Sequence, residues 1–304
     1  MTAVTGSIRR VLAWAALLGV VALLLFSLWW RVEGGRWMRV ETPSMGTRAP
    51  VGTLLWVRPA AFDTLQPGDF ITFHPPGRPD LTYSHLVHAR NADGTLTTKG
   101  VIPAADPWRI GPSDVIGTVR MKWWGAGWLV AAGPMLLAGG CLVMAVRAVV
   151  SKRWKAPVAL VLGSVVLVAT VLWWRPLLGA DRLAVAPDAS GGVTVTYVGT
   201  GLLPVRVSAE GGGTVVLADG EVGSVDTAPG SADRLNLIRL SPAITWWWWV
   251  LLVAVCFVPA LARLATGGRR ASPAAEVGSR PPCHRRVLES HRVPSHHRRV
   301  GAAG

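Results

Sequence analysis

Four segments of the chain are apolar over about the length that a helix needs to cross a lipid bilayer. They are residues 11–30, 128–150, 157–174 and 244–264. A helix rises about 1.5 Å per residue and the hydrocarbon core is about 30 Å thick, so about 20 residues span it. The chain has 304 residues, of which 51% are hydrophobic, and a mean hydropathy of +0.39. The pattern predicts a membrane protein with four transmembrane α-helices.

Positive charge is concentrated in three short segments that flank these spans, residues 1–10, 151–156 and 265–304. The positive-inside rule predicts that these segments are cytoplasmic and that residues 31–127 and 175–243 lie outside the membrane. We therefore expect a multi-pass protein located in the cell membrane, with residues 31–127 on its extracytoplasmic face. Because the net charge of +14 comes largely from the cytoplasmic segments and the tail, we expect the lipid bilayer as a partner and no nucleic acid.

The first span is interpreted as a retained anchor rather than a cleavable signal peptide. It is longer than the apolar region of about 7–15 residues in a signal peptide, and Trp29-Trp30-Arg31 follows it instead of a small-residue cleavage site. Tryptophans gather at the ends of the spans that face outward, as expected of amphipathic rings at a membrane interface. They are Trp29, Trp30, Trp123, Trp124, Trp128, Trp173, Trp174 and Trp246 to Trp249.

The basic tail from residue 265 is rich in Arg, Pro, Ser, Gly and Ala and is expected to be disordered, with anionic lipid head groups as its simplest ligand. Cys283 with His284, His291, His296 and His297 fits no strong zinc template, so no metal and no cofactor are expected. The other cysteines lie inside apolar segments, so no disulfide framework is expected.

Residues 31–127 change from apolar blocks to short runs separated by Gly, Pro and Asp, a pattern typical of β-domains. The expected strands are Thr53 to Arg58, Asp69 to His74, Leu81 to Arg90, Thr95 to Lys99 and Val115 to Lys122. Residues 175–243 have a similar pattern, with runs at Val193 to Val198, Leu203 to Ala209 and Thr214 to Leu217. The pattern of residues 175–243 predicts a small β-sandwich-like domain. This segment contains no histidine, no cysteine and no catalytic grouping of residues.

Three pieces of the first outer region carry residues that could do chemistry. Ser44 lies in a turn-prone stretch, Pro43-Ser44-Met45-Gly46, about 14 residues beyond the first span and so within about 50 Å of the membrane. Taken alone, such a serine is most often a surface turn residue. His85 and His88 lie three positions apart in a strand, and their side chains therefore point to opposite faces. At most one of them can serve a given site, and periodicity alone does not say which.

The third piece is Thr98-Lys99-Gly100-Val101, which is followed by Asp106-Pro107-Trp108. A carboxylate at Asp106 could hold a histidine in one tautomer and stabilise its imidazolium form. It could equally cap a turn before Pro107. The sequence leaves both interpretations open.

In this order and spacing the pieces resemble the type I signal peptidases, in the Ser/His branch found in archaea, the endoplasmic reticulum and some Gram-positive bacteria. The similarity runs from about Thr42 to Val119. Ser44-Met45 resembles the nucleophile box, and Leu65 to Phe73 the Gly-Asp strand. Ser84 to Val87 resembles the segment that carries the base, Thr98 to Gly100 with Asp106 the acidic box, and Val115 to Val119 the closing strand.

The chain departs from this family at two positions. The nucleophile box usually continues Ser-Met-Glu-Pro, whereas Gly46-Thr47 follows Met45 here. The acidic box usually reads Lys-Gly-Asp, whereas its third position is Val101 here. An orienting acid must then be Asp106 or be absent.

The resemblance implies a membrane-bound serine endopeptidase that removes the signal peptides of exported proteins. Ser44 would be the nucleophile, His85 the general base and Asp106 the third residue of a triad. An imidazole has an ordinary pKa of about 6.5 and can accept the serine proton near neutral pH. The alternative is a non-enzymatic membrane protein that uses the peptidase fold as a binding or assembly module, which Gly46 and Val101 favour. The oligomeric state is not predicted.

Overall fold

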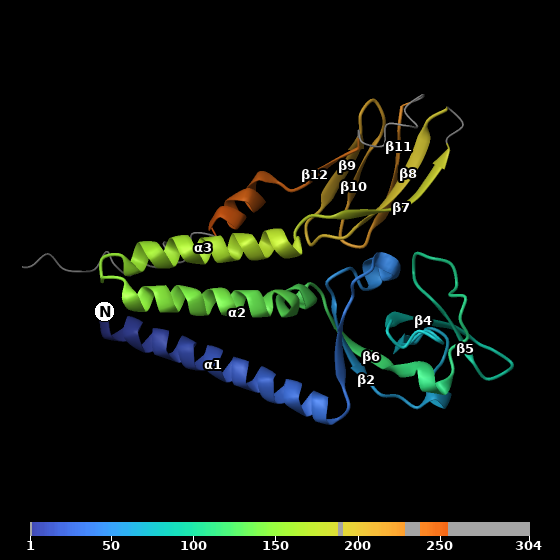
Figure 1. The fold of residues 1–304 in the computed structure, drawn as a ribbon, viewed down its shortest axis with the longest axis horizontal. Coiled ribbons are helices and arrows are strands. Elements are labelled where there is room, and N and C mark those ends of the chain that lie inside the picture. The colour runs from blue at the N-terminus through green and yellow to red at the C-terminus, as the bar shows by residue number, and fades with distance from the viewer. Residues whose placement is uncertain (1, 188–190, 229–237, 255–304) are drawn as a thin grey trace, which may run out of the picture. The chain divides into compact units, whose positions relative to one another are not determined.

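The computed structural model describes residues 2–187, 191–228 and 238–254 (Figure 1). All of these residues belong to one compact unit of the chain. The predicted basic tail, residues 265–304, and the Cys283 cluster lie outside the described residues. The described part combines helices with antiparallel sheets, so the chain is a mixed α/β protein.

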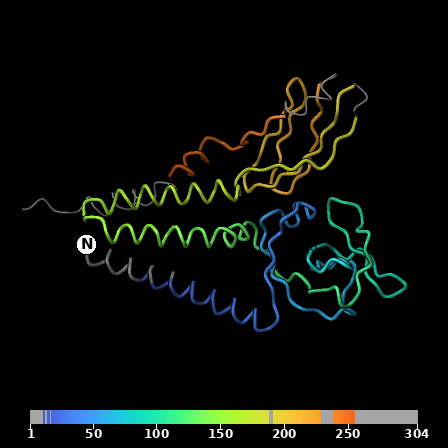
Figure 2. The backbone as a smooth tube through the Cα atoms, viewed as in Figure 1, coloured from blue at the N-terminus to red at the C-terminus, as the bar shows by residue number. Residues whose placement is uncertain are grey.

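Two of the described helices are long and apolar enough to cross a membrane, α2 (Ala126–Val149) and α3 (Lys155–Trp174). They pack side by side along their length, as the backbone trace shows (Figure 2). Each lacks acidic residues and has a core of Ala, Leu and Val, which matches the spans predicted at 128–150 and 157–174.

The other two predicted spans have less complete support. α1 (Thr2–Val32) is a helix of 31 residues, and its apolar stretch Leu17–Val32 is shorter than the other two spans. The segment predicted at 244–264 begins as a helix at residues 246–254, and the rest of it lies outside the described residues. The number of four transmembrane helices therefore stays a prediction.

Six strands within residues 31–127 form one antiparallel sheet, in the order β1-β2-β6-β3-β4-β5. The strands are β1 (Arg36–Arg39), β2 (Leu54–Arg58), β3 (Phe70–Phe73), β4 (Tyr83–Arg90), β5 (Leu96–Lys99) and β6 (Val115–Trp123). Five of them were expected from the sequence, and their bounds agree within two residues. β1 was missed because it is only four residues long and has an arginine at each end.

The core of this sheet anchors the segments that carry the candidate residues. One cluster contains Ile71, Phe73 and Val87 on the strands next to His85. A second cluster contains Val40, Met45 and Leu55, so the residue that follows Ser44 is part of the core. Because buried side chains are closely packed, the backbone that carries His85 and the backbone that carries Ser44 are both held in place.

An aromatic cluster joins the end of α1 to the sheet. Trp30 and Trp56 are 5% and 2% exposed, and their ring centroids lie 5.4 Å apart. Trp56 also contacts Trp123 at 4.7 Å and Phe26 at 5.2 Å. Trp30, which was expected at the membrane interface, is thus buried against the β-domain, whereas Trp29 and Trp123 stay exposed.

The described residues between 175 and 243 contain two three-stranded antiparallel sheets, β10-β9-β12 and β11-β8-β7. Their strands are β7 (Ala180–Pro187), β8 (Val193–Gly199), β9 (Val205–Ala209), β10 (Thr214–Leu217), β11 (Val222–Asp226) and β12 (Ile238–Pro242). Residues of both sheets share one core, including Val195, Val207 and Val225, as expected for a β-sandwich-like domain. The sequence pattern identified β8, β9 and β10 but missed the other three strands.

Candidate active site

Ser44 lies in a short 3₁₀ turn, Pro43–Arg48, that connects β1 to β2. Met45 anchors the turn because its side chain is 1% exposed and packs in the core. The carbonyl oxygen of Ser44 accepts hydrogen bonds from the backbone N–H groups of Val101 at 2.9 Å and Ile102 at 3.0 Å. The position of Ser44 is therefore fixed by the buried side chain of the next residue, Met45, and by the hydrogen bonds to its own carbonyl oxygen.

His85 lies in β4, opposite Ile71 of β3, and is 3% exposed. Val87 is buried on the same face of the strand, whereas His88 is exposed. The alternation expected from the sequence therefore separates the two histidines. His85 belongs to the face that meets Ser44, and His88 does not.

The structure brings all three residues expected from the sequence into one line of hydrogen bonds. The Oγ atom of Ser44 lies 2.9 Å from Nε2 of His85. The Nδ1 atom of His85 lies 2.7 Å from Oδ2 of Asp106. With the ring proton on Nδ1, the imidazole donates to the carboxylate and Nε2 is free to accept the proton of the serine hydroxyl.

Asp106 lies in the loop after β5 and is almost fully buried, with 9% of its side chain exposed. The hydroxyl of Thr98 donates to Oδ2 of Asp106 at 2.6 Å, and the backbone N–H of Asp106 donates to the carbonyl of Thr98 at 2.8 Å. The carboxylate therefore faces His85 instead of capping a turn before Pro107. The sequence places Thr98 in the Thr98-Lys99-Gly100 motif but does not reveal that its hydroxyl orients this acid.

Val101 contributes through its backbone. Its side chain is 47% exposed, while its N–H group holds the carbonyl of Ser44. Val101 therefore helps to fix the turn that carries Ser44, and Asp106 supplies the carboxylate that meets His85.

Aromatic rings limit the orientations open to the imidazole. The ring of Tyr83 lies 5.7 Å from that of His85 at 70°, and Phe73 lies 6.3 Å away at 66°. Trp108 packs on Tyr83 at 5.2 Å. Edge contacts of this kind are favourable for aromatic pairs. The sequence signal for them is the alternation that puts Tyr83 and His85 on one face of β4.

A groove of about 500 Å³ opens beside Ser44 and His85. It is lined by residues 37–42 on one side and 80–85 on the other. β1 has a strand partner only on its β2 side among the described residues, so its other edge is open to a peptide in extended conformation. The groove thus brings the hydroxyl of Ser44 and the imidazole of His85 next to an edge strand.

No group of three or more His, Cys, Asp or Glu residues that could hold a metal ion is found among the residues that the structure describes. A hydroxyl in contact with an imidazole that in turn contacts a carboxylate is an arrangement that can activate the hydroxyl as a nucleophile.

The chain was compared with protein-family models, with curated proteins and with solved structures, and none of the three comparisons gave a match.

Proposed function

We propose that this protein is a membrane-anchored serine endopeptidase of the signal-peptidase type. The observation that carries the proposal is the continuous hydrogen-bond line from Ser44 through His85 to Asp106, with distances of 2.9 and 2.7 Å. A nucleophile, a base in contact with it and a third group that orients the base are the three parts that covalent serine catalysis needs.

In this mechanism His85 takes the proton of Ser44 as the serine oxygen attacks the carbonyl carbon of the scissile peptide bond. Asp106 stabilises the imidazolium that forms, and His85 then returns the proton to the leaving amine. The acyl-enzyme is released when His85 removes a proton from water, which attacks the ester carbonyl. The burial of His85 and Asp106 strengthens the attraction between them, because little water screens their charges.

The proposed substrates are signal peptides of exported proteins, bound as an extended strand in the groove between residues 37–42 and 80–85. Support comes from the open edge of β1 and from the resemblance of the Ser44 and His85 segments to signal peptidases. Pairing with β1 supplies backbone hydrogen bonds, and small pockets would select small side chains next to the cleaved bond.

The proposal includes four membrane spans and a catalytic domain on the outer face of the cell membrane. α2 and α3 support it by their length and apolar composition, and the aromatic contacts of Trp30 and Trp56 join the end of α1 to the catalytic sheet. Anchoring of this kind keeps the groove next to the end of a substrate's apolar segment, which raises the effective concentration of the substrate.

The test is cleavage of a signal-peptide-bearing preprotein by the full-length protein in lipid nanodiscs, with labelling by a fluorophosphonate as a second measurement. We expect Ser44→Ala to abolish both and His85→Ala to lower kcat by about 10⁴-fold or more. His88→Ala is the matched control, since this histidine is exposed on the opposite face of β4, and it should retain nearly all activity.

Two results would overturn the proposal. Cleavage that survives in Ser44→Ala would show that the protease activity comes from another group or a contaminant. A wild-type protein that is folded but neither cleaves the preprotein nor reacts with the fluorophosphonate would instead indicate a binding module that has kept the fold.

A further inference from the structure

The turn between β10 and β11 reaches the turn that carries Ser44. Gly220 and Gly46 are both buried and meet backbone to backbone. A Cβ atom on Gly220 would overlap with the carbonyl group of Gly46 and would lie 2.7 Å from the nitrogen of Thr47. A Cβ atom on Gly46 would lie 3.3 Å from the carbonyl oxygen of Gly220. There is consequently no room for a side chain at Gly220.

Both glycines adopt conformations that other residues rarely adopt. The φ angle is +50° at Gly46 and +77° at Gly220. A left-handed conformation is unfavourable for residues with a Cβ atom. This accounts for the departure from the family pattern at position 46, because the chain needs glycine where another β-turn packs directly on the nucleophile turn.

The β10–β11 turn is itself rigid. The N–H of Gly220 donates to the carbonyl of Gly199 at 2.8 Å, and that of Gly199 donates to Glu221 at 2.9 Å. The carboxylate of Glu221 accepts from the N–H of Ala218 at 2.9 Å. A turn with its backbone groups paired in this way can act as a fixed surface for the segment against it.

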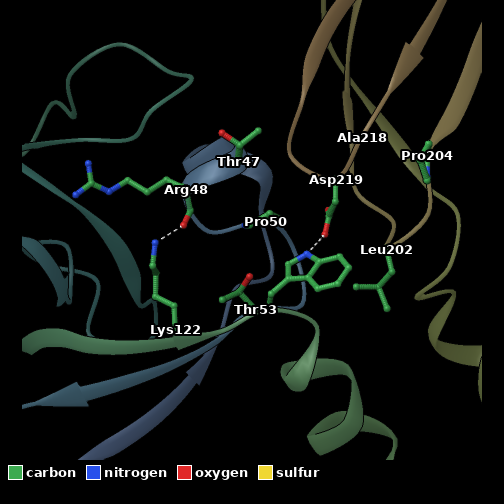
Figure 3. Close-up of a pocket in the computed structure, with 10 residues that line it drawn as sticks. Thr47, Arg48, Pro50, Thr53, Lys122, Leu202, Pro204, Ala218 and Asp219 are labelled. Atoms are coloured by element: carbon green, nitrogen blue, oxygen red, sulfur yellow. Dashed lines mark hydrogen bonds between the residues drawn. The ribbon is translucent and has the colours of Figure 1, made fainter.

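A side-chain hydrogen bond secures the contact. The indole N–H of Trp124, at the junction of β6 and α2, donates to Oδ2 of Asp219 at 2.7 Å (Figure 3). Burial raises the pKa of Asp219 to about 6, and the bond from Trp124 opposes that rise. Beside this bond lies a pocket of about 450 Å³, between Thr47 and Pro50 on one wall and Leu202 and Pro204 on the other. The contact between the two regions is therefore narrow and depends on few groups.

The nucleophile turn also meets a second close approach, from residues 100–102. A Cβ atom on Gly100 would lie 2.8 Å from the carbonyl oxygen of Ser44, which already accepts from Val101 and Ile102. The Ser44 turn is thus contacted by residues 100–102 and by Gly220. A displacement of either neighbour moves the serine relative to His85.

We infer that the second β-domain, residues 180–242, is a structural part of the catalytic centre, in which Gly220 and Asp219 position the nucleophile turn that carries Ser44. This inference rests on the proposed peptidase function for its catalytic consequence. Gly220 is a positioning residue, since it touches the backbone at Gly46 and Thr47 and is absent from the lining of the substrate groove. Its loss should lower kcat and leave the KM for the peptide nearly unchanged.

The experiment compares two glycine-to-alanine variants of the full-length protein in nanodiscs. In Gly220→Ala the new Cβ atom would lie 2.7 Å from the nitrogen of Thr47, closer than the 3.4 Å of an ordinary contact, so the turn that carries Ser44 must move away. Gly191→Ala is the matched control, because Gly191 has a φ of +80° in the same domain and nothing within 4 Å of its Cβ position. Both variants carry the same backbone strain, and only one touches the nucleophile turn.

We expect Gly220→Ala to lower kcat by about 10²-fold, the effect of misplacing a reacting group by up to 1 Å, with KM changed less than about threefold. Gly191→Ala should keep kcat within about twofold of wild type, since exposed sites away from special contacts have small effects. Asp219→Ala should also lower kcat, while Asp219→Asn should restore it, because an amide oxygen still accepts from Trp124.

Amide hydrogen exchange gives a readout that does not depend on catalysis. The N–H groups of Val101 and Ile102 should exchange faster in Gly220→Ala than in Gly191→Ala, because their acceptor on Ser44 is displaced. Equal kcat and equal exchange in the two variants, with an active wild type, would overturn the inference and leave the peptidase proposal intact. A wild type without Ser44-dependent activity would instead contradict the peptidase proposal, and the exchange data would still decide whether the contact positions the turn.

Discussion

Replacing Asp106 by asparagine should remove most of the activity without unfolding the domain. Both hydrogen bonds to this side chain, from His85 at 2.7 Å and from Thr98 at 2.6 Å, end on the same oxygen, Oδ2. An amide oxygen in that place can accept both, so the buried donors stay paired and the change removes only the negative charge.

The magnitude follows from the charge that His85 acquires during attack. An imidazolium and a carboxylate about 4 Å apart attract each other by about 4 kcal/mol at an effective dielectric constant of about 20. This attraction exists only once the ring is protonated, so its loss raises the barrier and leaves the ground state nearly unchanged. At about 1.4 kcal/mol per factor of ten, kcat should fall by about 1,000-fold.

The assay is steady-state cleavage of a preprotein in nanodiscs, with thermal unfolding followed by tryptophan fluorescence to verify folding. KM should change little, because Asp106 is absent from the groove lining. Thr98→Val is the companion variant: it keeps the charge, removes one donor and should cost about tenfold. If Asp106→Asn kept more than a tenth of the wild-type kcat, or acted mainly on the unfolding midpoint, the carboxylate would be a structural cap and the triad argument would be wrong.

Two further predictions concern stability. Trp56→Ala should lower the free energy of unfolding of the first β-domain by about 3–5 kcal/mol, since this ring is 2% exposed and contacts the rings of Trp30 and Trp123. Chemical denaturation followed by circular dichroism measures this free energy, and a loss below about 1 kcal/mol would show that the cluster is loosely packed. Asp219 has its pKa raised from 3.8 to about 6 in the folded protein, so the folded state binds more protons between these values and its stability should decrease as pH rises through about 4 to 6. Asp219→Asn should remove that decrease, and an identical pH dependence of the unfolding midpoint in both proteins would contradict the assignment.

Much of the local structure could be predicted from periodicity. The strand around His85 alternates buried and exposed side chains, which separates His85 with Val87 from His88. The apolar runs at 128–150 and 157–174 correspond to α2 and α3, which are long and apolar enough to cross a membrane. β1 and β7 could not be predicted in this way, because β1 is short and β7 is mostly exposed, so neither has a buried face to set a pattern.

The role of Asp106 could not be decided from the sequence, because a carboxylate before proline suits a turn as well as a triad. The decision came from the pairing of β4 with β5, which brings the loop after β5 to the His85 face of the sheet. Val101 is a similar case, because its backbone N–H donates to the carbonyl of Ser44, and a pattern of side chains cannot reveal a backbone contact.

The sequence by itself determined the two long apolar helices, most strands of the two β-rich regions and the identity of the three candidate residues, because each depends on composition or on spacing along one segment. Only the tertiary structure decided that Ser44 and His85, 41 positions apart, lie in hydrogen-bond contact, and that Gly220 of the second β-domain packs on the turn that carries Ser44. Contacts of this kind depend on how sheets pair and pack in space, and short-range sequence patterns carry no record of them.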